Sequence, residues 1–148
     1  MISRKLCEPE GEKMLEEIEA MINDNSSDDY WYDDSLFSCQ ELINKLSDAE
    51  WHSFSEKTDS YSQKCKLRIV ECLADIQSKD SISLILKLSN TENRDIFIAC
   101  IDSLRDMDMS DVSDAEKDNL LKKVNKFSAD ASSPEKIIFQ AFCKSINI

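Results

Sequence analysis

Few residues in this chain of 148 are suited to catalysis or metal binding. His52 is the one histidine, and its Trp-His-Ser-Phe context is typical of the exposed turn of a short amphipathic helix. The six cysteines form no Cys-x-x-Cys pair and lie mostly in apolar helical phase, at Cys7, Cys39, Cys65, Cys72, Cys100 and Cys143. A single Gly excludes a phosphate-binding glycine loop. We therefore predict a protein that is not an enzyme, without catalytic residues, metal or cofactor, whose cysteines serve as small buried hydrophobes.

An acidic and aromatic segment has the composition of a protein-binding site. It falls in a stretch rich in Asn, Ser and Asp, residues 23–34, which we interpret as a break between helices. Its candidate partner-binding residues are Asp28, Asp29, Tyr30, Trp31, Tyr32, Asp33 and Asp34. Trp and Tyr bury large areas at small entropic cost, and Asp can pair with Arg or Lys of a basic partner. The alternative is a solvated loop whose Trp31 folds back onto the core.

A second candidate surface consists of carboxylates spaced along two predicted helices. At an offset of 31 residues, Glu71 matches Asp102 and Asp75 matches Asp106. If the two helices stack as neighbours, the four carboxylates form one acidic ridge, a second candidate site for a basic partner. The alternative is an ordinary solvated face that nearby Lys and Arg residues neutralise.

The charge of the chain also favours a basic protein partner. The net charge is −12, and residues 1–60 hold 16 acidic and 5 basic residues, a net charge of −11. Phosphate backbones and anionic membranes would be repelled, so we predict no direct binding of nucleic acid or membranes. Long-range attraction would speed encounter with a basic protein. Plain solubility is the alternative explanation of the acidity.

Helix signals recur along the chain, and with 1 Gly and 2 Pro the sequence predicts an all-α fold of about eight antiparallel helices. Their approximate ranges are 10–22, 35–46, 47–54, 62–77, 80–88, 93–107, 113–127 and 133–146. Expected N-caps include Ser35, Ser47, Asn93 and Ser113, with Asp80 or Ser81 opening the short helix of the middle region. Pro134 falls in the first turn of the last helix, where its missing N–H costs nothing.

Residues 79–107, KDSISLILKLSNTENRDIFIACIDSLRDM, resemble a HEAT-type repeat with a capped first helix, a polar turn and an Ala-Cys second helix. The resemblance implies a HEAT-like α-solenoid, and an irregular helical bundle is the alternative. We expect one domain over residues 1–148. It comprises an acidic part at 1–60, a HEAT-like core at 61–110 and a C-terminal helix pair at 111–148.

With its size, its acidity, Trp51, the repeat and residues 98–107, the chain resembles the helical immunity proteins of bacterial contact-dependent growth inhibition and related polymorphic toxin systems. The resemblance implies a protein that binds a cognate toxin domain, commonly a basic nuclease, and blocks its active site. We expect a monomer that forms a 1:1 complex. The N-terminus shows no secretory h-region, and no apolar run has the roughly 20 residues of a membrane span, so we expect a cytoplasmic protein with reduced thiols.

Two other functions remain open from the sequence. One is a HEAT-like adaptor that binds a regulatory protein without inhibiting a toxin. The other is an acidic mimic of nucleic acid that occupies a DNA- or RNA-binding protein.

Overall fold

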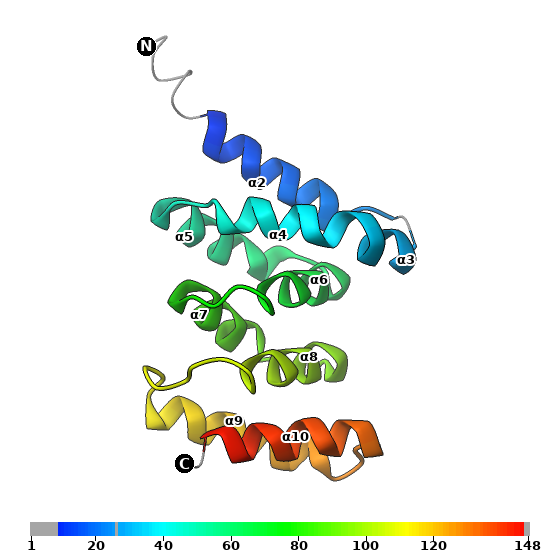
Figure 1. Ribbon diagram of the computed structural model, residues 1–148, viewed down its shortest axis with the longest axis vertical. Helices are drawn as coiled ribbons and strands as arrows, with labels where there is room; N and C mark the ends of the chain where they lie inside the picture. Colours follow the sequence, from blue (N-terminus) through cyan, green and yellow to red (C-terminus); the bar gives the residue numbers. More distant parts are fainter. Residues whose placement is uncertain (1–8, 26, 147–148) are drawn as a thin grey trace. The chain divides into compact units, whose positions relative to one another are not determined.

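The structure, a computed structural model, describes residues 9–25 and 27–146, and Cys7 lies outside these ranges. The described residues form eight α-helices of nine or more residues, one shorter α-helix and no strand (Figure 1), so the all-α prediction is confirmed. The chain divides into two compact units, Met1–Cys72 and Leu73–Ile148. Each unit is described by itself below.

Unit 1 is built from five α-helices with one π-helical and one 3₁₀ segment. These are α2 (Pro9–Ile22), α3 (Asp28–Tyr30), η1 (Trp31–Ser35), α4 (Leu36–Asn44), α5 (Asp48–Lys57), η2 (Thr58–Ser60) and α6 (Gln63–Leu73). α2 packs against both α4 and α5. The predicted capping box is confirmed: the Ser47 side chain accepts from the Glu50 backbone N–H, while the Glu50 side chain accepts from that of Ser47.

The break predicted at residues 23–34 is wrong in its second half. A helix begins at Asp28, because the Ser27 side chain accepts a hydrogen bond from the Tyr30 N–H and two carboxylates occupy the first turn. The chain then continues through the π-helix η1 directly into α4, where the Leu36 N–H bonds to the Trp31 carbonyl. Ser35 therefore makes no side-chain cap and lies inside a continuous helical segment.

Unit 2 consists of α7 (Lys79–Leu88), α8 (Arg94–Leu104), α9 (Asp114–Ser128) and α10 (Ser133–Ile146). Asn93 and Ser113 cap their helices as predicted. The cap of α7 is Ser78, which accepts from the Ser81 N–H, so the expectation of Asp80 or Ser81 is wrong. Ser78 is the cap because it directly precedes the first helical residue with an extended backbone, which places its hydroxyl where it can accept from the Ser81 N–H.

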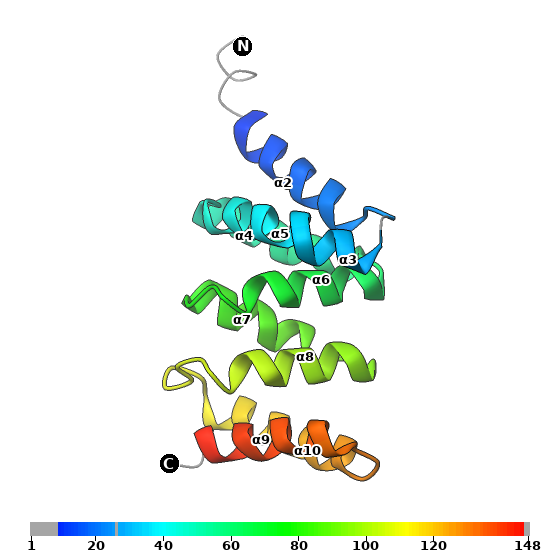
Figure 2. The same ribbon diagram turned by 45° about the vertical axis from the view of Figure 1, so that its right-hand side comes forward.

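The core of unit 2 centres on α8, which packs against α7 and α10; both views show α8 beside α10 (Figures 1 and 2). Phe97 of α8 is fully buried. Its ring stacks on that of Phe127 at 4.7 Å between centroids, and lies 6.3 Å from the Phe139 ring. Aromatic contacts of this kind join α8, α9 and α10 into one core.

α6 and α8 repeat each other locally at the predicted offset of 31. Both helices have 11 residues, and their first residues are Gln63 and Arg94. Equivalent positions are buried in both helices, in the pairs Cys65/Ile96, Ile69/Cys100, Val70/Ile101, Cys72/Ser103 and Leu73/Leu104. Each helix ends earlier than expected, in the same kind of turn: Ile76 N–H bonds to the Leu73 carbonyl, and Met107 N–H to that of Leu104.

An ion pair ties the start of α10 to α8. Arg94 contacts Glu135 at 2.8 Å and Asp130 at 3.1 Å, and also donates to the Phe127 carbonyl at 3.2 Å. Glu135 in addition accepts from the Ser132 N–H at 2.9 Å. The hydrogen bond from Arg94, followed by that from Ser132, lowers the pKa of Glu135 from 4.5 to about 2.

This lowered pKa predicts a loss of stability in acid. Because the folded pKa lies below the unfolded value, the contribution of Glu135 is present above pH 4.5 and lost as the pH falls through about 2. Glu135→Gln should therefore lower the melting temperature at pH 7 and have little effect near pH 2. Parallel thermal melts across this range test the prediction, and a difference that does not vary with pH would contradict it.

Candidate protein-binding face

Three large aromatic side chains of unit 1 are exposed in the acidic and aromatic segment or directly after it. Tyr30 is 48 % exposed, Tyr32 52 % and Phe37 68 %. Four exposed carboxylates are interspersed with them, at Asp28, Asp29, Asp33 and Asp34. We call these seven exposed residues, which are spread along the helical segment of α3, η1 and α4, the acidic–aromatic face. Phe37 is not among the predicted site residues. It falls in the predicted helix 35–46, and the helical pattern does not show that its side chain is exposed.

Trp31 is the exception among the adjacent aromatics, since its side chain is only 1 % exposed. It folds back onto the core, as the alternative interpretation of this segment foresaw. Its indole Nε1–H donates to Glu71 Oε1 at 3.1 Å. Trp31 therefore supports the face from beneath and is not available at its surface.

Glu71 holds two adjacent residues of the π-helix. One carboxylate oxygen accepts from Trp31, and the other accepts from the Tyr32 hydroxyl. This hydrogen bond, assisted by partial burial, raises the pKa of Tyr32 to about 12. Tyr32 therefore stays protonated well above physiological pH while it donates to Glu71.

Arg68 of α6 lies against Trp31 and is only 3 % exposed. Its guanidinium carbon is 4.8 Å from the centroid of the Trp31 ring. Nη1 donates to the carbonyl of Asp24 at 2.8 Å and that of Ile22 at 3.3 Å. Nη2 lies 3.9 Å from Asp28 Oδ1 and makes no hydrogen bond among the described residues. The guanidinium can be buried on this inward-facing side of α6 because main-chain carbonyls and an aromatic ring surround it.

The structure places the residues of the predicted acidic ridge in different surroundings. Glu71 belongs to unit 1 and is engaged by Trp31 and Tyr32, whereas Asp75, Asp102 and Asp106 belong to unit 2. Asp102 pairs at 2.8 Å with Arg105, the residue directly after α8, so this carboxylate is neutralised locally. Glu71 therefore joins the acidic–aromatic face as its support.

Histidine and cysteine occupy the kinds of position that the sequence predicts. His52 is exposed on α5 and its Nε2 lies 3.0 Å from Glu56 Oε1. The free thiols of Cys39, Cys65, Cys72 and Cys100 are buried. Burial raises the pKa of Cys100, and hydrogen bonding to Cys39 together with burial raises that of Cys72, which suppresses thiolate formation.

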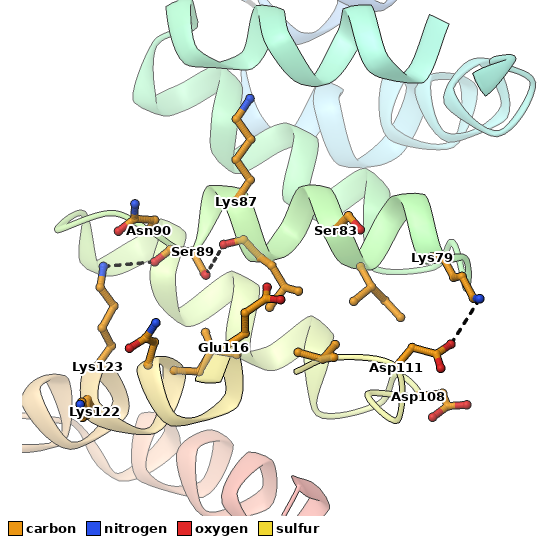
Figure 3. A pocket seen from close by; sticks show the side chains of 15 residues that line it. Lys79, Ser83, Lys87, Ser89, Asn90, Asp108, Asp111, Glu116, Lys122 and Lys123 are labelled. Carbon is orange, nitrogen blue, oxygen red and sulfur yellow. Dashed lines mark hydrogen bonds and ion pairs between the residues drawn. The ribbon is translucent and has the colours of Figure 1, made fainter. Parts of the chain in front are cut away.

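A groove of about 870 Å³ lies between α7, α9 and the turn before α9 in unit 2 (Figure 3). Its apolar lining includes Ile82, Leu86, Val112 and Leu120. Lys79 and Asp111, 3.5 Å apart, meet at one end, and at the other Lys123 donates to the Ser89 carbonyl. The rim holds both lysines and carboxylates, so its charge does not select a ligand.

No protein-family model, characterised protein or solved structure matches the chain. In the part of the chain that the structure describes, no helix has the length and apolar character needed to cross a membrane. Functional inference therefore rests on the geometry and charge of the surfaces described above.

Proposed function

We propose that this chain is an immunity protein, which binds a cognate toxin domain through the acidic–aromatic face and thereby blocks the toxin's active site. The observation that carries the proposal is the exposure of Tyr30, Tyr32 and Phe37 among four carboxylates on one continuous helical segment. Exposed aromatic clusters rimmed by charge are typical of protein interfaces.

The face has features of a pre-organised binding site. The hydrogen bond to Glu71 restricts the Tyr32 side chain before a partner binds, which reduces the entropy lost on binding. Carboxylates beside aromatic anchors would pair with Arg and Lys of the partner, and the net charge of −11 over residues 1–60 would steer the encounter.

A basic nuclease is the toxin class that best fits this chemistry. An enzyme that cleaves nucleic acid must attract phosphates, so its substrate cleft is positively charged. Four carboxylates on a short segment can occupy such a cleft in place of phosphates. The chain needs no catalytic residue of its own for this role.

Reversing charge on the face should impair neutralisation. In these toxin systems the immunity gene lies directly after its toxin gene, so the partner to test is the protein encoded directly upstream. Asp33→Lys with Asp34→Lys is expected to raise the dissociation constant for this toxin at least about tenfold, since like charges then face each other. Cells that express the toxin together with this double variant should no longer be protected from the toxin. The matched control, Glu16→Lys with Glu17→Lys, makes the same charge change at exposed positions of α2 and should lower affinity far less, because it weakens only the long-range attraction.

Salt dependence tests the attraction between charges, and the choice of partners separates this role from its alternatives. The association rate should fall as salt shortens the Debye length from ~10 Å at 0.1 M to ~3 Å at 1 M. Equal affinities for both double variants would place the contact elsewhere. If the chain binds the protein encoded upstream without inhibiting it, the chain is an adaptor. If it binds several unrelated nucleic-acid-binding proteins, it is an acidic mimic of nucleic acid.

A further inference from the structure

A second groove, of about 1090 Å³, lies on unit 2 between α9 and α10. Val124 and Ser128 contribute from α9, while Lys136, Ile137, Gln140 and Lys144 contribute from α10. Lys136, Gln140 and Lys144 are spaced by four residues along α10, and Ile137 is adjacent to Lys136, so all four lie toward one side of the helix. This groove shares no lining residue with the acidic–aromatic face or with the groove of Figure 3.

The charge of this groove is opposite to that of the chain. Its lining contains two lysines and no carboxylate, in a protein of net charge −12. Glu135, which directly precedes Lys136 in the sequence, is paired with Arg94. Among the described residues, Lys136 and Lys144 form no ion pair or hydrogen bond through their side chains. The groove is therefore a site of positive charge that the described part of the chain leaves uncompensated.

An exposed aliphatic side chain stands in the same groove. Ile137 is 63 % exposed and is the one large hydrophobic residue with this degree of exposure among the described residues of unit 2. The lining also includes Ala141, which is half-buried, and the buried side chains of Val124 and Phe139. An occupant that covers Ile137 would remove this area from water, at roughly 25 cal/mol per Å² of apolar surface.

We propose that this groove docks an acidic segment of a partner protein that also carries an apolar side chain. The apolar side chain would cover Ile137, while carboxylates would face Lys136 and Lys144. Charge complementarity selects an acidic occupant, and the apolar lining selects a protein segment over a bare polyanion. This site is independent of the proposed immunity function, because it lies in the other unit and attracts the opposite charge.

Cys143 is a natural reporter for this site. It lines the groove and is half-buried, whereas the other four described cysteines are buried. In a Cys7→Ser background, the rate at which a thiol reagent modifies native protein therefore reports access to the groove. The probes are short synthetic peptides: one of alternating Leu and Glu blocks, one in which Lys replaces Glu, and one in which Ser replaces Leu.

The Leu/Glu peptide should slow modification of Cys143 in a saturable manner, and the other two peptides should protect it at least about tenfold more weakly. Lys136→Glu with Lys144→Glu should abolish protection, and Ile137→Ser should weaken it, while melting shows that the fold is intact. The matched control, Lys45→Glu with Lys57→Glu in unit 1, changes the net charge equally and should retain protection.

Each contrary outcome overturns the proposal. If the Leu/Glu peptide does not protect Cys143, or if the Leu/Lys peptide protects it equally well, the groove does not bind an acidic segment. Protection by oligothymidylate as strong as that by the Leu/Glu peptide would indicate a nucleic-acid site. Protection that grows with protein concentration and needs no peptide would identify a second copy of this chain as the occupant. None of these results bears on the Asp33 and Asp34 variants, so the two proposals stand or fall separately.

Discussion

Replacing Trp31 by alanine should lower the free energy of unfolding of unit 1 by about 3–5 kcal/mol. The side chain is 1 % exposed, so its removal leaves a cavity between the π-helix and α6. The substitution also takes a donor from Glu71 and uncovers the buried guanidinium of Arg68. Loss of the ring over a buried cation adds to the cost of the cavity.

Tyr30→Ala is the matched control, because it removes the neighbouring aromatic from an exposed position. We expect a change within about 0.5 kcal/mol. Urea unfolding followed by circular dichroism measures both variants. Equal stabilities of the two variants would show that Trp31 does not support the fold.

The equivalent experiment in unit 2 is Phe97→Ala, which should also cost about 3–5 kcal/mol. Phe97 is fully buried, and it makes ring contacts with Phe127 and Phe139. Its loss therefore removes contacts to both α9 and α10. Ile137→Ala, on the exposed side of α10, should change stability by about 0.5 kcal/mol or less.

Denaturant unfolding again measures the difference, and a probe in each unit shows where it acts. If Phe97→Ala lowers the transition seen by unit 2 probes alone, the two compact units unfold separately. A Phe97 variant as stable as the wild type would contradict the assignment of this ring to the core.

The buried position of Trp31 decides how binding experiments on the acidic–aromatic face must be designed. A Trp31 variant would lose affinity through unfolding, whatever the partner contacts. Charge reversal at Asp33 and Asp34 leaves the core untouched, since both side chains are exposed. The face can therefore be tested only through its exposed residues.

Local signals in the sequence determined the helical elements. Scarcity of Gly and Pro, apolar residues at helical spacing, and caps such as Ser47, Asn93 and Ser113 depend on contacts within a few residues. The Ser27 cap and the acidic first turn at Asp28 are signals of the same kind, and reading them would have found α3. The offset of 31 was likewise visible, because equivalent burial requires equivalent apolar spacing.

The arrangement of the candidate face depended on contacts between distant residues. Trp31 and Glu71 are 40 positions apart, and Arg68 reaches the carbonyls of Ile22 and Asp24 across more than 40. Whether an aromatic side chain points to solvent or to the core is decided by such partners. The sequence determined which residue types gather in this segment. Only the tertiary structure decided that Trp31 is buried while Tyr30, Tyr32 and Phe37 are exposed, because a composition of Asp, Tyr and Trp permits either orientation until α6 supplies a carboxylate and a guanidinium beneath it.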